Sequence, residues 1–220
     1  YQENKPQYRI LLLIALAHGL NDLIQGVIPS IYPTLQSKYA LTMTQVGVIT
    51  LCYQLSASIL QPLVGNYTDK HPKPYSQVLG MAFTTIGIVS LSLASSYAAI
   101  LCSVVFIGVG SSVFHPEASR VAFLASGGRR SFAQAIFQLG GNFGTALAPL
   151  LVILLLLSKK VIDGRVVEES HQGNLIWFAS FSIFGMFILL LIGKWRSILL
   201  KLLKKKVKKP VVLPNLTRAQ

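Results

Sequence analysis

Six long apolar segments, joined by short polar stretches, account for most of this chain. They lie at 10–35, 44–66, 75–95, 98–120, 131–157 and 174–193. A helix needs about 20 predominantly apolar residues to cross the hydrocarbon core of a membrane, and each segment reaches that length. Because lipid satisfies no backbone hydrogen bonds, only helices and closed barrels span it. The sequence therefore predicts an all-α membrane protein with six transmembrane helices.

The basic residues indicate how these helices are oriented. The chain carries a net charge of +13, and Lys and Arg gather in the short cytoplasmic loops of membrane proteins. One predicted side holds both chain ends and the loops after the second and fourth segments, with Lys5, Arg9, Lys70, Lys73, Arg120, Arg129, Arg130 and the basic residues from Lys194 onward. We expect both ends to be cytoplasmic and the largest outer segment to lie near 158–173. The cytoplasmic placement of Lys and Arg accounts for the net positive charge of the chain, so no nucleic-acid partner is expected.

The tail after the last apolar segment has its own pattern. Trp195, Ile198 and Leu202 recur at helical spacing, whereas Lys201 and the lysines from 204 onward take the other face. This pattern predicts a basic amphipathic helix at 194–209 on the inner membrane surface, with anionic lipid near Lys201–Lys209. Pro210 and Pro214 interrupt it. We therefore expect three parts: a bundle at 1–193, the interfacial helix, and a cytoplasmic linker at 210–220.

A polar island interrupts the first apolar segment. His18, Asp22 and Gln25 are three or four residues apart, so they share one helix face. At 1.5 Å per residue, Asp22 lies about 18 Å along the segment, near the middle of a hydrocarbon core of about 30 Å. Ionisable groups at that depth are costly and mark ion or substrate pathways. We predict that Asp22 and His18 couple the protein to protons.

Amide side chains form further stripes on the first, second and fifth segments. The candidates for substrate binding are Asn21, Gln25, Gln54, Gln138 and Asn142. Such residues either coordinate a polar solute in a cavity or hydrogen-bond neighbouring helices to one another. The sequence leaves both interpretations open.

The fourth segment carries a second island, near its predicted cytoplasmic end. Glu117 and Arg120 are three residues apart and can pair on one helix face, beside His115. We interpret this group as a gate, and the alternative is a static ion pair that fixes the helix end. A rival hypothesis makes His115 and Glu117 the acid and base of an intramembrane enzyme, but the pattern has neither a nucleophile nor a metal set. Cys52 and Cys102 also lack metal-ligand spacing, so no metal or other cofactor is expected.

The loop after the second segment points to a family. Its Gly65, Asp69, Lys70 and Lys73 have the spacing of the signature loop of the major facilitator superfamily, with Pro72 where that pattern usually has Gly. Further matching segments are Leu20-Asn21-Asp22, Ile59-Leu60-Gln61-Pro62-Leu63-Val64-Gly65, Gly110-Ser111-Ser112-Val113-Phe114-His115-Pro116-Glu117, Ala125-Ser126-Gly127-Gly128-Arg129 and Gln138-Leu139-Gly140-Gly141-Asn142. With these, the chain resembles the fosmidomycin-resistance efflux family over nearly its whole length.

The resemblance implies a fold and an activity. The fold has twelve helices in two halves, each built from two inverted three-helix repeats, and this chain corresponds to the N-terminal half. The second half would come from the same parent chain, a partner chain or a second copy. The implied activity is proton-driven export of a small polar or anionic drug across the bacterial inner membrane, with the signature-loop residues as a latch. A proton-coupled importer and a non-transporting six-helix partner subunit are the alternatives.

Overall fold

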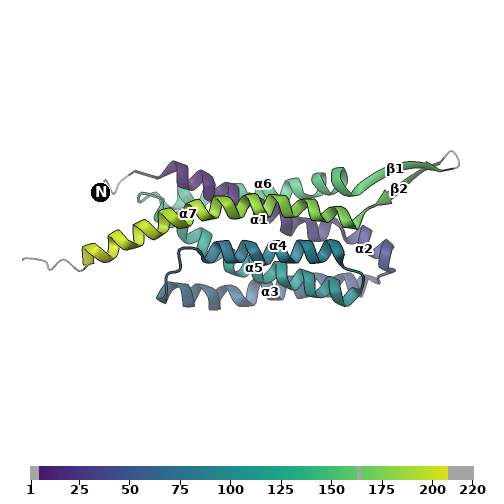
Figure 1. Ribbon diagram of the computed structural model, residues 1–220, viewed down its shortest axis with the longest axis horizontal. Helices are drawn as coiled ribbons and strands as arrows, with labels where there is room; N and C mark the ends of the chain where they lie inside the picture. Colours follow the sequence, from purple (N-terminus) through teal and green to yellow (C-terminus); the bar gives the residue numbers. More distant parts are fainter. Residues whose placement is uncertain (1–4, 163–164, 208–220) are drawn as a thin grey trace, which may run out of the picture.

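Long helices that run side by side form the body of the molecule (Figure 1). The computed structural model describes residues 5–162 and 165–207. Its α-helices are α1 Tyr8–Ser30, α2 Tyr32–Tyr39, α3 Met43–Lys70, α4 Ser76–Leu93, α5 Tyr97–Leu124, α6 Arg130–Leu156 and α7 Phe178–Val207. In the described part of the chain, six helices are long and apolar enough to cross a membrane, the sixth including the 3₁₀ turn η1 Gln172–Trp177 before α7. The predicted six spans are confirmed.

Local sequence signals explain where several helices begin and end. Thr42 caps α3 in a reciprocal capping box with Gln45, and the Ser96 side chain accepts the Ala99 N–H at the start of α5. The first apolar segment gives two helices rather than one, because the chain turns at Ile31 and α2 begins there with Pro33 in its first turn.

The pattern of helix pairs is symmetric. Helix α1 packs on α6 and α3 packs on α5; likewise α4 packs on α5 and α7 packs on α1. If α1, α3 and α4 are exchanged, in that order, with α5, α6 and α7, the α1–α6 pair becomes the α5–α3 pair. The same exchange turns the α4–α5 pair into the α7–α1 pair. This is the arrangement expected for two three-helix repeats related by a pseudo-two-fold axis in the membrane plane.

The segment near 158–173, which is expected to lie outside, contains a β-hairpin. Strands β1 Leu157–Ile162 and β2 Arg165–Ser170 pair antiparallel, with Leu157 opposite Ser170. The hairpin extends from the end of α6 beyond the helices (Figure 1). Six-residue strands cannot be recognised reliably beside long apolar helices, because they carry too few residues for a clear period of two.

The last helix continues past the boundary predicted at 193. Helix α7 runs without a break to Val207, so residues 194–207 extend the sixth span and do not form a separate element. Arg196 and Leu199 are buried, and α7 packs against α1 and α4. The amphipathic pattern of the tail thus reflects, at least in its first turns, packing against the bundle. The predicted linker at 210–220, Lys208 and Lys209, and the side chains of Lys204, Lys205 and Lys206 lie outside what is described.

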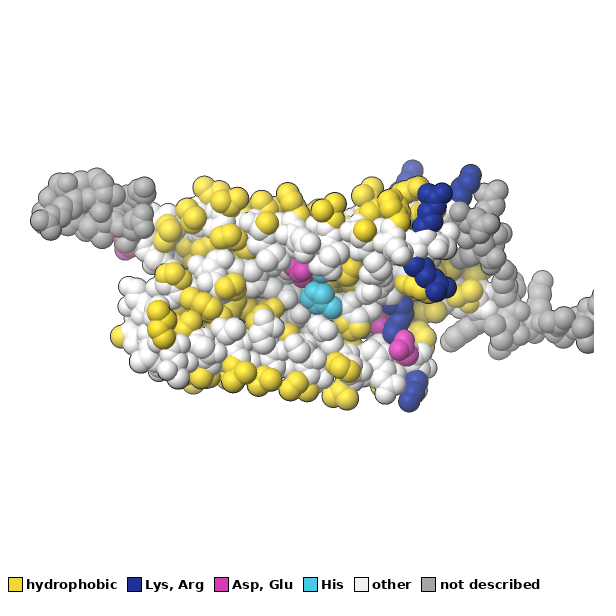
Figure 2. Space-filling view, turned by 180° about the vertical axis from the view of Figure 1, so that it is seen from behind, with side chains coloured by type: hydrophobic (Ala, Val, Ile, Leu, Met, Phe, Trp, Pro, Cys, Tyr) yellow, Lys and Arg dark blue, Asp and Glu magenta, His cyan; other side chains and the backbone are white. Residues whose placement is uncertain are grey.

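Apolar and basic side chains occupy different parts of the surface along the length of the molecule. Apolar side chains cover the length of the face in Figure 2, whereas Lys and Arg side chains gather at one end. Exposed apolar residues such as Leu12, Ile59 and Leu154 are numerous, as expected for helices that face lipid. Acidic and histidine side chains are visible near the middle of this face, and further acidic side chains lie among the basic ones (Figure 2).

Candidate functional site

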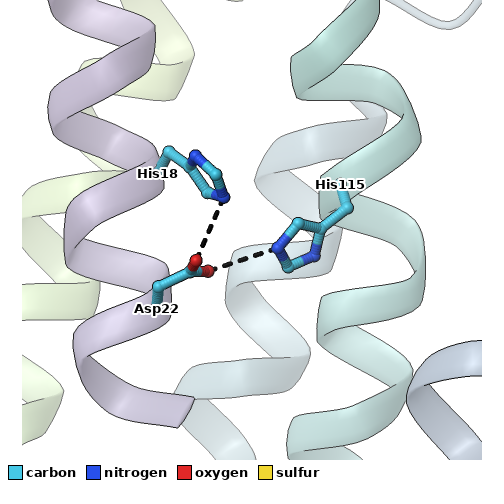
Figure 3. Close-up of side chains that lie close together, drawn as sticks. All are labelled: His18, Asp22 and His115. Atoms are coloured by element: carbon cyan, nitrogen blue, oxygen red, sulfur yellow. Dashed lines mark ion pairs between the residues drawn. The ribbon is translucent and has the colours of Figure 1, made fainter. Parts of the chain in front are cut away.

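A carboxylate between two imidazoles forms the centre of the candidate site (Figure 3). Asp22 Oδ2 lies 3.1 Å from Nε2 of His18, one turn earlier on α1. Asp22 Oδ1 lies 3.2 Å from Nε2 of His115 on α5. The side chain of Asp22 is 15% exposed, that of His115 25%, and that of His18 1%. The three residues form a mostly buried acid–base cluster, which we call the carboxylate–histidine cluster.

Both imidazole rings are held by their other nitrogen. His18 Nδ1 lies 2.8 Å from the Phe137 carbonyl oxygen, and the two rings stack with centroids 3.9 Å apart. His115 Nδ1 lies 2.9 Å from the Ser111 carbonyl oxygen. A carbonyl oxygen only accepts, so in both residues Nδ1 is the donor. Each Nε2 is therefore left to face the carboxylate.

Glycine lets helix α6 approach this cluster. A Cβ added at Gly141 would overlap the His18 ring and lie 2.7 Å from Asp22 Oδ2. On the same face of α6, a Cβ at Gly140 or Gly144 would collide with the backbone of α1. The glycines therefore bring α6 close enough for Phe137 to stack on His18 and fix its ring.

Asp22 also forms part of the wall of a cavity of about 270 Å³ whose lining includes several polar side chains. The other lining residues are Gln25, Gly26, Pro29, Tyr32, Thr50, Tyr53, Gln54 and Thr145. Tyr53 donates to Gln25 Oε1 at 2.5 Å, and Gln25 Nε2 lies 3.4 Å from Asp22 Oδ1. Hydroxyl and amide groups thus link the carboxylate to a space large enough for a small polar solute.

The predicted substrate-binding residues divide into two groups. Gln25 and Gln54 line the cavity together with Asp22. Asn21 is fully buried instead, where its side chain donates to Asp22 Oδ1 at 3.2 Å and accepts from Thr84 on α4. Gln138 and Asn142 are exposed on α6 and are hydrogen-bonded to each other at 3.1 Å. The structure therefore brings two of the five to the cavity.

A second charged cluster lies toward the basic end of the bundle. Glu117 on α5 is fully buried and binds Arg120 through Oε1 and Arg196 of α7 through Oε2. Ser76 at the start of α4 donates to Oε2 at 2.6 Å. Arg120 also binds Asp69 at the end of α3. This latch cluster joins four helices and has no net charge, since two arginines balance two carboxylates.

The structure separates residues that the sequence analysis grouped. The Glu117–Arg120 pair is present as expected from its spacing, whereas His115 faces Asp22 and not the latch cluster. His115 and Glu117 therefore do not converge as an enzymatic acid and base would. Lys70 and Lys73 are exposed, and their ammonium groups bind no described residue.

Gly65, the remaining residue of the predicted gate, lies inside α3, and a Cβ added there would meet only Pro116, at 3.9 Å. A larger hollow of about 690 Å³ lies near these residues, between α3 and α4, but its lining is mostly apolar.

One residue of the latch cluster and one residue of the cavity were not predicted from the sequence. Arg196 was grouped with the other basic residues of the tail, but the structure buries it. Tyr53 lies beside Gln54 on α3 and was not selected because a tyrosine in an apolar span is usually a packing residue. A signal for Arg196 existed: it is a charge within one turn of the last apolar segment.

Comparisons with known proteins agree with the fold. Residues 14–216 match the sequence profile of the Major Facilitator Superfamily. The chain is 45% identical over 210 residues to the "Fosmidomycin resistance protein" of Escherichia coli (strain K12), covering 96% of this chain and 49% of that protein. It is 42% identical over 188 residues to the "Uncharacterized MFS-type transporter YfnC" of Bacillus subtilis (strain 168), covering 86% and 43%.

Among solved structures, the chain resembles a bacterial homolog of the human lysosomal transporter Spinster, described as inward-facing and unoccupied. The TM-score is 0.63 at 18% identity, over 84% of this chain and 42% of that one. At this identity the likeness concerns the fold alone. In each comparison the chain spans about half the length of the protein it matches.

Proposed function

The chain belongs to the major facilitator superfamily and is a multi-pass membrane protein, and from this we propose that it is the N-terminal six-helix half of a proton-coupled exporter. Its substrate is a small polar or anionic drug of the fosmidomycin type, as the name of its Escherichia coli relative indicates. Family membership favours transport over catalysis. The second six-helix half encloses the substrate from the other side, near the membrane midplane.

One observation carries the proton coupling: a carboxylate is buried between two imidazoles at the wall of a cavity that amide and hydroxyl side chains also line. Burying a charge at mid-membrane depth costs several kcal/mol unless it is paired. A helix-packing role needs no ionisable group, since amides and hydroxyls serve it at lower cost. Asp22 and His18, joined by His115, are therefore the best candidates for binding and releasing protons.

Exchange of protons for substrate follows if protonation of Asp22 shifts the equilibrium between an outward-facing and an inward-facing conformation. Asp22 takes up a proton while the cavity faces outward and releases it while the cavity faces inward, and the substrate moves in the opposite direction. A ligand shifts such an equilibrium only by its difference in affinity for the two states. Gln25 and Gln54 line the cavity and contact the substrate in this mechanism. Asn21 positions Asp22, and Gln138 and Asn142 face the space that the second half closes.

The latch cluster serves as the gate at the basic end. Glu117, Arg120 and Asp69 hold α3 and α5 together, and exposed Lys70 and Lys73 remain available to the second half or to lipid. Gly65 lies on α3 beside Pro116 of α5. Positive charge at this end supports a cytoplasmic location for both chain ends, in the bacterial inner membrane. The basic extension of α7 then lies near anionic lipid.

The test is proton movement in inverted membrane vesicles that contain the full-length protein. After a pH gradient is established, added fosmidomycin should dissipate it, because drug and protons exchange. Asp22→Asn should abolish this response, whereas Glu169→Gln, an exposed acid on β2, should leave it unchanged. A response that persists in Asp22→Asn would refute the role of Asp22. A folded protein that gives no response would refute fosmidomycin as substrate and leave an importer or a partner subunit to be tested.

A further inference from the structure

The carboxylate–histidine cluster has the composition of a metal site. We propose that His18, Asp22 and His115 bind a divalent transition-metal ion of the Zn²⁺ type. The bound ion occupies Asp22 at the cavity wall and thereby blocks transport. The binding itself rests on the geometry of these residues. Only the predicted block of transport rests on the proposed function.

The three ligand atoms already converge. One nitrogen from each histidine and a carboxylate oxygen all lie within 4.8 Å of one another. In a tetrahedral zinc site with bonds of about 2.1 Å, ligand atoms are about 3.4 Å apart. Each imidazole nitrogen lies close to that distance from one Asp22 oxygen, His18 at 3.1 Å from Oδ2 and His115 at 3.2 Å from Oδ1. An ion between the two rings therefore binds the carboxylate through both oxygens, or through one oxygen after the carboxylate turns, and the two imidazole nitrogens move closer together.

The spacing and chemistry of the ligands select the class of ion. His18 and Asp22 are four residues apart on α1, the separation that places two metal ligands on one helix face. Two imidazoles and one carboxylate favour Zn²⁺, Co²⁺, Ni²⁺ or Cu²⁺. Mg²⁺ and Ca²⁺ are disfavoured because they require oxygen ligands.

The rings are oriented as metal-binding histidines are. Ligating histidines almost always donate their second N–H to a carbonyl or carboxylate, which fixes the ring and the tautomer. Here both Nδ1 groups donate to backbone carbonyls, of Phe137 and Ser111. In the neutral rings, both Nε2 lone pairs then point at the carboxylate. Lone pairs that face a carboxylate repel it unless a proton or a metal ion lies between them, so the same geometry that holds a proton suits a metal ion.

A buried nitrogen without a hydrogen bond supports the same conclusion independently. His18 is 1% exposed, and its Nε2 has no hydrogen bond of good geometry, although Asp22 Oδ2 lies 3.1 Å away. Buried polar atoms of this kind are rare and require an explanation. A divalent ion coordinated by Nε2 satisfies it. The ion also changes the charge of two neutral imidazoles and one carboxylate from −1 to +1.

A fourth coordination position remains open on the cavity side. Asp22 lines the cavity of about 270 Å³, so a water molecule or a substrate oxygen can complete the tetrahedron there. The backbone of Gly141 leaves the His18 ring and Asp22 Oδ2 room that a Cβ would fill. Three protein ligands with one open position are the pattern of catalytic zinc sites, whereas structural sites are closed by four protein ligands.

The experiment measures Zn²⁺ binding by isothermal titration calorimetry to the purified full-length protein, with any polyhistidine tag replaced by another tag. We expect one saturable Zn²⁺ per chain that depends on the cluster. His18→Gln and His115→Gln should each weaken binding by more than about 10-fold. The matched control is His71→Gln, an exposed histidine after α3, which should bind as the parent does.

Spectroscopy on the unmutated protein keeps the test valid if a variant fails to fold. X-ray absorption at the zinc edge should show two imidazole ligands, and Co²⁺ should give the visible bands of a tetrahedral ion. The proposal is overturned by an absence of saturable binding, by binding that both glutamine variants retain, or by a zinc shell without two imidazoles. Zn²⁺ that binds as expected but does not slow proton movement in vesicles would support the metal site and contradict proton coupling at Asp22.

Discussion

Replacing Arg196 by methionine tests whether the end of the sixth span is part of the latch cluster. Arg196 is 1% exposed and Glu117 is fully buried, and the two side chains form an ion pair that joins α7 to α5. Methionine keeps most of the length and apolar surface of the side chain but removes its charge. Among the described residues, Glu117 then still contacts Arg120 and the Ser76 hydroxyl.

The burial of both partners sets the expected magnitude. Removing one member of a buried ion pair costs about 3–5 kcal/mol, because the other charge stays buried without it. Since Glu117 keeps two partners, we expect the lower end, about 3 kcal/mol of unfolding free energy. Asp69 is 67% exposed, so Asp69→Asn at the other end of the same cluster should cost less than about 1 kcal/mol.

Equilibrium unfolding of the full-length protein in mixed detergent micelles provides the assay. The double variant Glu117→Gln/Arg196→Met should lose less free energy than the sum of the two single variants, by about 1 kcal/mol or more. Lys201→Met, an exposed residue on the same helix, is the matched control and should be nearly neutral. If Arg196→Met costs no more than Asp69→Asn, or if the two single losses add, the buried pair does not stabilise the fold as argued.

Two further substitutions test the packing and the cavity. Gly144→Ala places a Cβ against the backbone of α1, so it should destabilise the protein by about 1–3 kcal/mol. Gly47→Ala, where a Cβ meets nothing within 4 Å, should be neutral or stabilising in the same unfolding assay. Tyr53→Phe removes one donor to Gln25 Oε1, but Ser111 still donates to that atom. Its cost should therefore stay below about 1.5 kcal/mol, and a larger loss of stability would show that Tyr53 has a role beyond this hydrogen bond.

Much of the fold could be predicted because its causes are local. Span length, apolar composition and the basic loops are properties of short windows, and each predicted span overlaps one long helix, although the sixth helix ends 14 residues later than predicted, at Val207 instead of 193. The signature loop around Asp69 indicated the family for the same reason. The hairpin after α6 and the continuation of α7 past residue 193 were not predicted. The hairpin depends on pairing between its two strands. The continuation of α7 depends on packing against α1 and α4, which are distant in sequence.

The candidate site was predictable in part. The face of α1 that carries His18 and Asp22 follows from the helical repeat alone, and so does the pairing of Glu117 with Arg120. His115 was assigned to the wrong group because its neighbours in sequence, Pro116 and Glu117, point elsewhere on the helix. Its contact with Asp22 joins residues 93 positions apart, which no spacing rule reaches.

The sequence by itself determined that this chain spans a membrane six times, which end of each span is basic, and that a carboxylate lies at mid-depth. The membrane acts on each helix separately, so these features depend only on the composition of a segment and the distance along it. The tertiary structure alone decided which polar groups meet: the second imidazole at Asp22, and the buried arginine of α7 at Glu117. Such pairs depend on how close the glycines of α6 let the helices approach and on the register between them. Those distances are set only when the whole bundle packs.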